Sequence, residues 1–330
     1  MHGNTSQTSD SPHSGGAAHL IGVEIGGTKL QIAAGDSDGK LTEKLRFHID
    51  RGAGAEGIRH QLEQELPALA SKWKAAAIGV GYGGPVDWKT GRIARSYHIE
   101  GWSGFPLGEW LSGCTGLPAY VENDANTAAL GEALYGAGKN ANPVLWINAG
   151  SGVGGGLVID EQIYHGAPPG EMELGHLRLT REGAITEDFA SGWSVDRMVR
   201  EAVLKNPRGE LALALQGDQA PGGEARALRP ALEAGDRDAE MILDMVGASL
   251  AYALSHAVHL LHPEVVVFGG GLALIGEPLR ARIATALPQW LMDAFHPGPE
   301  IRLAELMEDA VLAGSLAVAA GRLRASLRTH

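Results

Sequence analysis

Two glycine-rich turns carry the residues best suited to hold a phosphate. In residues 21–29, IGVEIGGTK, an apolar run ends near the carboxylate of Glu24, and two glycines, a threonine and a second apolar run follow. Residues 143–160, PVLWINAGSGVGGGLVID, repeat the order of apolar run, glycine-rich bend and apolar run. Glycine lets a ligand approach the main chain closely, and exposed amides beside a carboxylate suit a phosphate with its Mg²⁺ ion. The repetition indicates an internal duplication, with two phosphate-binding turns facing each other across a cleft.

Carboxylates and an imidazole form a second group of candidates. Asn123 and Asp124 stand where a strand is expected to end and a helix to begin, in VENDANTAALGE. Either one suits a helix N-cap, and a carboxylate at the mouth of a sheet also suits a general base. The nearby glycine turns favour the base. Glu173, His176 and Glu187 follow the second turn and could accept hydrogen bonds from sugar hydroxyls, the alternative being a solvated acidic loop.

Apolar periodicity and turn residues predict the elements that would position these groups. Strands are expected at residues 20–24, 30–34, 41–49, 75–80, 118–122 and 265–268, the last running into three glycines. Helices are expected at 56–72, from 123 or 124 to about 135, and at 194–203, 223–233, 238–261, 275–291 and 309–327. Residues 166–187 are expected to be irregular. The alternation of strands and helices through both halves favours an α/β fold.

Other chemistries lack the motifs that they need. G-x-G-x-x-G occurs around Gly79 and around Gly150, but a dinucleotide site needs a helix directly after the glycines, where this chain has a turn and a strand. Neither G-x-x-x-x-G-K-[ST] nor G-x-S-x-G is present. His256, His259 and His262 recur every three residues without H-E-x-x-H or a cysteine cluster, which favours packing or surface roles over a metal site.

Composition bounds the remaining classes of protein. The chain has 330 residues, enough for two lobes, and its net charge of −12 argues against a non-specific nucleic-acid binder. Cys114 is the one cysteine, so no disulfide framework is expected and a reducing cytoplasm is favoured. No apolar run reaches membrane-spanning length. The first eighteen residues are predicted to be a disordered tail and not a signal peptide.

Five segments, in order, resemble motifs of the ROK family of bacterial sugar kinases and repressors. IGVEIGGTK resembles its first phosphate motif, GVGYGGPVDWKTG its glycine–proline turn, and VENDANTAALGE its catalytic segment. AGSGVGGGLVIDEQIYHGAPPGEMELGH resembles its signature, and VVVFGGGLA its adenosine motif. The resemblance covers nearly the whole chain after the tail. It implies an α/β, two-lobed, actin/hexokinase-like (ribonuclease H-like) fold, with lobes at residues 19–122 and 123–308 and the closing helix 309–327 packed on the first lobe.

The same resemblance implies ATP-dependent phosphorylation of a hexose or hexose derivative, of the glucokinase or fructokinase type. Asp124 would be the base that takes a proton from the sugar hydroxyl, and Glu24 would approach Mg²⁺ through water. The implied sugar-binding residues are Asn123, Glu173, His176, Glu187 and His98. The residues implied to border ATP are Gly26, Gly27, Thr28, Lys29, Ser151 and Gly152 at the phosphates, with Gly270 and Gly271 at the base. The resemblance also implies a homodimer, whereas the composition favours a cytoplasmic location with neither nucleic acid nor membrane as a partner.

Three departures from the family pattern bear on activity. Glu24 stands where the family commonly has Asp, and His98 where it commonly has a sugar-binding Asn. With Cys114 alone, the zinc site of one His and three Cys that many members carry cannot form. A sugar-binding protein that has lost catalysis is therefore an alternative. A sugar-responsive repressor is a weaker one, because the roughly twenty residues before the first motif are too few for a helix-turn-helix unit.

Overall fold

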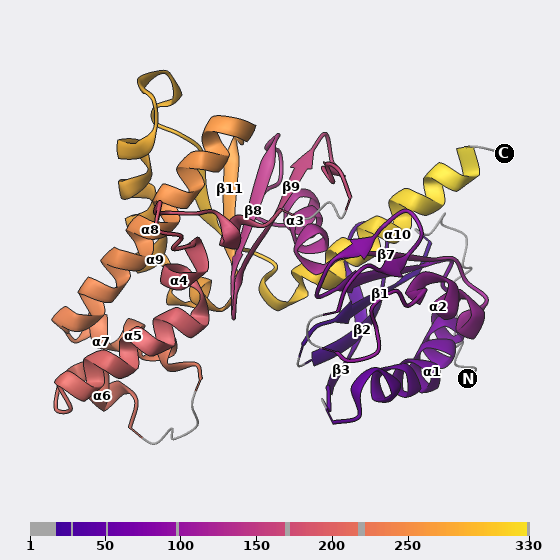
Figure 1. Ribbon diagram of the computed structural model, residues 1–330. Helices are drawn as coiled ribbons and strands as arrows, with labels where there is room; N and C mark the ends of the chain where they lie inside the picture. Colours follow the sequence, from indigo (N-terminus) through magenta and orange to yellow (C-terminus); the bar gives the residue numbers. More distant parts are fainter. Residues whose placement is uncertain are drawn as a thin grey trace, which may run out of the picture.

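Two five-stranded sheets form the framework of this computed structural model, which describes residues 18–27, 29–50, 52–96, 99–168, 172–216 and 222–328 (Figure 1). The first contains β1 (Leu20–Ile25), β2 (Lys29–Gly35), β3 (Leu41–His48), β4 (Ile78–Tyr82) and β7 (Ala119–Asn123). The second contains β8 (Val144–Ala149), β9 (Val153–Ile159), β10 (Gln162–Ile163), β11 (Val265–Gly269) and β12 (Glu300–Leu303). A two-stranded sheet joins β5 (Val86–Asp87) to β6 (Arg92–Ile93).

The two large sheets have the same topology. The first has the order β3-β2-β1-β4-β7 and the second the order β10-β9-β8-β11-β12. In each, the first two strands form an antiparallel hairpin, a third strand extends it, and two parallel strands follow on the other side. The α/β class and the internal duplication predicted from the two glycine-rich turns are therefore confirmed.

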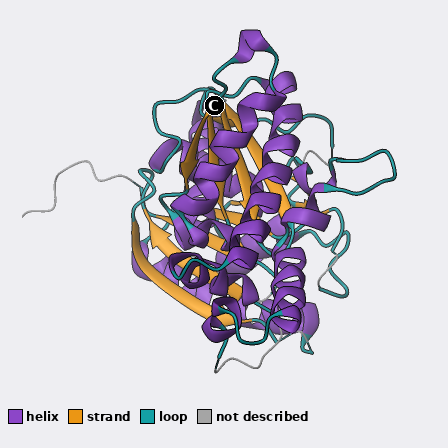
Figure 2. Ribbon diagram, turned by 90° about the vertical axis from the view of Figure 1, so that its left-hand side faces the viewer, coloured by secondary structure: helices purple, strands orange, loops and turns teal. Residues whose placement is uncertain are grey.

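Helices cover both sheets, and Figure 2 shows several of them in front of strands. They are α1 (Gly54–Trp73), α2 (Leu107–Thr115), α3 (Asp124–Tyr135), α4 (Thr186–Ala190), α5 (Gly192–Lys205), α6 (Glu210–Ala214), α7 (Leu228–Glu233), α8 (Arg237–Leu261), α9 (Glu277–Ala286) and α10 (Ala310–Arg328). Short 3₁₀ turns lie at Leu174–His176, Glu224–Ala227, Gly271–Ile275, Leu287–Trp290, Asp293–Phe295 and Met307–Asp309. The helix predicted at 56–72 corresponds to α1, and its apolar residues Ile58, Leu62, Leu66 and Leu69 are buried in the core beside the first sheet.

Most predicted elements are confirmed, with three kinds of difference. The helix predicted at 275–291 is divided into a 3₁₀ turn, α9 and a second 3₁₀ turn. Gly276, at a φ of 81°, has a left-handed conformation that ends the first segment, and Pro288 lacks the amide hydrogen that a continuing helix needs. The strand predicted at 75–80 begins later, at Ile78. Neither α2 nor β12 was predicted.

The last strand of each sheet leads into a helix that packs on the other sheet. The helix α3 follows β7 and contacts β8 and β9, whereas α10 follows β12 and contacts β1 and β4. The two helices also contact each other between the lobes (Figure 1). Glycine permits this: a Cβ on Gly314 would lie 1.7 Å from the Thr127 carbonyl oxygen, and one on Gly79 would lie 1.8 Å from that of Ser315. The lobe boundary at residues 122 and 123 stays a prediction.

A buried carboxylate joins the two places where the chain crosses between the sheets. Glu132, near the end of α3, is fully buried. It accepts hydrogen bonds from the amide of Ala137, at 2.8 Å, and from those of Glu305 and Leu306, at 3.2 and 2.8 Å. Ala137 follows α3 on the way to β8, and the other two precede α10. The two crossings are therefore tied to a single side chain.

Two helices meet the length and composition expected of a membrane span, namely α8 and the segment Met307–Leu327. In their most apolar windows, 61% and 56% of the residues are buried inside the protein. Core packing accounts for that apolar character. The prediction from unbroken apolar runs did not identify these segments, because polar residues interrupt them.

Candidate active site

The turn between β1 and β2 is closed by a hydrogen bond from the Gly26 amide to the Lys29 carbonyl, at 3.0 Å. Glu24 lies beside it at 5% exposure. Its Oε1 is 2.9 Å from Lys29 Nζ, and its Oε2 accepts a 2.6 Å hydrogen bond from Gln31 Nε2. The residue expected between Gly27 and Lys29, Thr28, is outside the described residues. The first turn therefore combines a glycine backbone with a fixed pair of opposite charges.

Asn123 and Asp124 are both candidates for the helix N-cap, and Asp124 also for the general base. Asn123 is the N-cap of α3, and its Oδ1 accepts hydrogen bonds from the amides of Ala125 and Asn126 at 2.9 and 3.1 Å. Its Nδ2 donates to the Gly84 carbonyl at 3.2 Å. Asp124 accepts a 2.8 Å hydrogen bond from the Ala125 amide and faces a cavity. Capping thus falls mainly on Asn123.

That cavity, of about 370 Å³, brings both glycine-rich turns and the third glycine bend together. The predicted residues that line it are Glu24, Lys29, Asp124, Ser151, Gly270 and Gly271. Asp124 lies close to the first turn, because a Cβ on Gly83 would be 3.4 Å from Asp124 Oδ2 and 3.5 Å from Gly26 Cα. Residues from both halves of the duplication therefore line the same cavity.

Burial raises the pKa of Asp124 to about 7, and the negative charge of Glu24 contributes in the same direction. The hydrogen bond from the Ala125 amide and the positive charge of Lys29 act in the opposite direction. A carboxyl with a pKa near neutrality can take up a proton and release it again in ordinary buffer, which is what a general base requires.

The other predicted sugar-binding residues lie outside that cavity's lining. Glu187 accepts a 2.7 Å hydrogen bond from the Val153 amide and lies against Gly152, where a Cβ would be 2.5 Å from its Oε1. Glu173 and His176 are exposed, at the two ends of a 3₁₀ turn. His98 is outside the described residues. The structure therefore joins Glu187 to the second turn, and the sugar-binding roles stay predictions.

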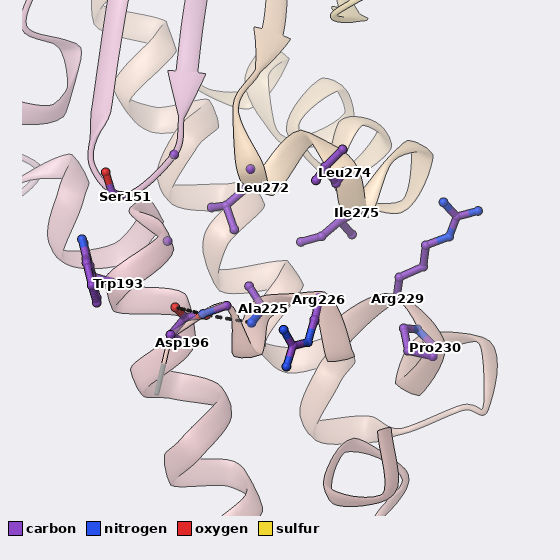
Figure 3. Close-up of a pocket in the computed structure, with 15 residues that line it drawn as sticks. Ser151, Trp193, Asp196, Ala225, Arg226, Arg229, Pro230, Leu272, Leu274 and Ile275 are labelled. Atoms are coloured by element: carbon purple, nitrogen blue, oxygen red, sulfur yellow. Dashed lines mark hydrogen bonds between the residues drawn. The ribbon is translucent and has the colours of Figure 1, made fainter. Parts of the chain in front are cut away.

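A larger cavity of about 830 Å³ adjoins the first, sharing Gly150, Ser151, Gly271 and Leu274 (Figure 3). Its wall is set by Asp196, 5% exposed, which accepts hydrogen bonds from the amides of Gly223 and Ala225 at 2.8 and 2.7 Å. Among the lining residues that the sequence did not indicate are Trp193, Asp196, Arg226, Arg229, Leu272 and Ile275. The sequence contains one signal, a tryptophan directly before a predicted helix, and in the structure this residue, Trp193, is 64% exposed.

Oxygen ligands for Mg²⁺ are present at the smaller cavity. Glu24 and Asp124 both line it, and carboxylate oxygens are the ligands that Mg²⁺ prefers. Among the described residues each Glu24 oxygen has one partner, which leaves a second lone pair. Within the described ranges no three His, Cys, Asp or Glu side chains cluster closely enough to hold a metal ion. The donor set therefore fits an ion that draws its other ligands from phosphate and water.

The three spaced histidines pack against aromatic rings. The rings of His259 and His262 lie 5.4 and 3.8 Å from that of Phe295, and His256 lies 4.8 Å from Tyr252. These contacts agree with the packing role that the sequence favoured.

Comparisons with known proteins agree with this architecture. The model of the ROK family matches residues 20–322. The glucokinase of Thermotoga maritima is 30% identical over 312 residues, which are 92% of this chain and 98% of that protein. The glucokinase of Halalkalibacterium halodurans is 32% identical over 308 residues, 89% of this chain and 92% of that one.

A solved structure is similar over the same range. It is a ROK family glucokinase from Streptomyces griseus in complex with glucose and AMPPNP, with a TM-score of 0.80 and 27% identity. The match covers 92% of this chain and 100% of that chain. The predicted two-lobed, actin/hexokinase-like fold is thereby confirmed.

Proposed function

This chain belongs to the ROK family, and on that basis we propose that it is a sugar kinase that transfers a phosphoryl group from ATP to a hydroxyl of a hexose or hexose derivative. The observation that carries the proposal is the position of Asp124, whose carboxyl, with a pKa of about 7, shares one cavity with both glycine-rich turns. Relatives that are glucokinases, one of them bound to glucose and AMPPNP, support a hexose and a nucleotide as substrates.

The two adjoining cavities suit the two ends of ATP. The larger is wide enough for a nucleoside, with Trp193 and Leu272 among its lining residues. Ser151 and Gly271 line both cavities, so the phosphates would pass between them toward Lys29. A bound Mg²⁺, approached by Glu24 through water, would neutralise charge on the phosphate oxygens.

Asp124 would orient the attacking hydroxyl and accept its proton. Phosphoryl transfer depends chiefly on alignment and charge neutralisation, so the fixed start of α3 matters as much as the basicity of Asp124. Asn123, Glu173, His176, Glu187 and His98 stay the proposed sugar-binding residues. Glu173 and His176 are exposed, and closure of the lobes over substrate would both bring them inward and exclude water. A homodimer and a cytoplasmic location are further parts of the proposal.

An ADP-release assay across a panel of hexoses with Mg·ATP tests this function. We expect ADP formation that depends on one or a few sugars, at least ten times above the rate without sugar. The alternative is a sugar-binding protein without catalysis, which would bind a hexose in calorimetry and release no ADP. That result would overturn the proposal.

A further inference from the structure

His165 joins the two halves of the duplication beside Asp124. It follows β10 of the second sheet, and its Nε2 is 2.6 Å from Oε2 of Glu122 in β7, the last strand of the first sheet. The Glu122 side chain is 4% exposed and that of His165 16%. A carboxylate only accepts hydrogen bonds, so His165 Nε2–H is the donor. A hydrogen bond to a charged group that is shielded from water is among the stronger ones in proteins.

The other oxygen of Glu122 holds the start of α3. Its Oε1 accepts hydrogen bonds from the Asn123 amide at 2.9 Å and from Asn126 Nδ2 at 3.1 Å. Asp124 lies between these two residues in the first turn. A shift of the Glu122 carboxylate would therefore shift the backbone that aims Asp124.

The face of the His165 ring is held as well. It stacks on Trp88, in the turn between β5 and β6, at a centroid distance of 4.2 Å and an interplanar angle of 19°. Arg322 of α10 lies over the same indole, with Cζ 4.5 Å from its centroid. Separate elements thus fix the orientation from which His165 Nε2 reaches Glu122.

We propose that His165 is a positioning residue for phosphoryl transfer, which donates a hydrogen bond to Glu122 and so holds the start of α3, and with it Asp124, from the opposite half of the molecule. The inference rests on the proposed kinase function. It goes beyond that function, because His165 lines neither cavity beside Asp124 and acts through Glu122.

Two substitutions separate the hydrogen bond from the ring. His165→Phe keeps an aromatic face for Trp88 and loses the donor, whereas His165→Gln keeps an N–H donor and loses the ring. We expect His165→Phe to lower kcat about 10- to 100-fold, the rate equivalent of one hydrogen bond to a charged group, with KM for ATP within about twofold. We expect His165→Gln to retain kcat within about threefold. His60→Phe, at an exposed position of α1, is the matched control.

A double substitution with Glu122→Gln tests whether the two side chains act as a pair. Once Glu122 is changed, His165→Phe should lower kcat less than it does in the native chain. Equal losses in His165→Phe and His165→Gln, or no loss in either, would overturn the proposal. Wild-type turnover is measured first, so that a failed kinase assay counts against the function alone. Amide hydrogen exchange at residues 123–127 tests the positioning independently, and it should be faster in His165→Phe than in His165→Gln.

Discussion

The two hairpin turns have the same place in their sheets but different chemistry. The turn between β1 and β2 is flanked by Glu24 and Lys29, which form an ion pair. The turn between β8 and β9 contains Gly150, Ser151 and Gly152 and no ionisable side chain. The two copies therefore share a glycine-rich backbone at this turn, while charged side chains flank only the first.

The residues that lead into α3 and α10, the two helices that each pack on the other sheet, also differ between the copies. Asp124, at the start of α3, faces the cavity. At the corresponding place before α10, Glu308 and Asp309 pair with Arg46 and Lys44 of β3 at 3.0 and 2.6 Å, although Glu308 also lines the cavity. The first copy supplies the proposed base, and the second pairs its acids with basic side chains of β3.

The largest expected effect comes from replacing Asp124, with a carboxylate at the corresponding place in the other copy as the control. Asp124→Asn should lower kcat by about 10²- to 10⁴-fold, because it removes the general base, while sugar binding measured by calorimetry is kept. Asp309→Asn, the corresponding change in the other copy, should leave kcat within about twofold, because it removes only an exposed ion pair. Near wild-type turnover in Asp124→Asn would show that another group accepts the proton.

The next effect concerns the helix that crosses to the first sheet. In Gly79→Ala the new Cβ would lie 1.8 Å from the Ser315 carbonyl oxygen of α10, so the helix must move away. We expect a loss of about 1–3 kcal/mol in the free energy of unfolding, measured by denaturant titration. Gly321→Ala is the control, since no atom lies within 4 Å of that position and alanine favours a helix. Equal stability of the two variants would contradict the close packing of α10.

A smaller effect is expected at Gly271, in the glycine bend after β11, where a substitution should weaken ATP binding without affecting stability. A Cβ on Gly271 would have no protein atom within 4 Å, yet Gly271 lines both cavities. Gly271→Ala should therefore raise KM for ATP about tenfold, equivalent to roughly 1.4 kcal/mol, and leave the melting temperature unchanged. An unaltered KM would place the nucleotide elsewhere.

The pH dependence of kcat/KM tests the effect of Glu24, the carboxylate that only the first turn has beside it. Because the pKa of Asp124 in the ligand-free protein is about 7, kcat/KM should rise with pH through neutrality as the base form is populated. Glu24→Gln should move that midpoint to lower pH, because it removes a negative charge that raises the pKa. A midpoint that stays in place would mean that another group titrates.

The same pKa has a consequence for stability, with a definite sign. Folded Asp124 holds its proton up to a pH of about 7, whereas an unfolded aspartate releases it near pH 4. Its contribution to stability is therefore present at acidic pH and is lost as pH rises through about 7. Asp124→Asn should gain stability relative to the wild type at pH 8 and not at pH 4, as thermal unfolding at both values would show.

The sequence predicted those parts of the structure that depend on local pattern. The hairpin of β1 and β2 is two apolar runs around glycines, and α3 begins at a favoured capping pair. The helix α2 was missed because it contains two glycines in nine residues, and β12 because only one of its four residues is buried. Neither has a periodic pattern long enough to recognise.

The candidate site was predictable only in part, for a similar reason. Asp124 and the glycine turns lie at the ends of strands, where topology brings them together. The larger cavity is formed by residues from the turn after β8, from α5, from α7 and the segment before it, and from the turn after β11, which only tertiary packing unites. The bond between His165 and Glu122 joins residues 43 positions apart and has no local signal.

The buried carboxylate of Glu132 has a mechanical meaning for such an enzyme. Glu132 accepts hydrogen bonds from both backbone segments that cross between the lobes. It therefore suits a hinge point about which the lobes could rotate. Displacement in a swing grows with the length of the arm. Asp124 is eight residues away on the same helix and so roughly 12 Å from Glu132. It would move little in such a rotation, whereas the parts of the lobes farthest from Glu132 would move most. The reacting groups could thus stay in register while the entrance opens wide.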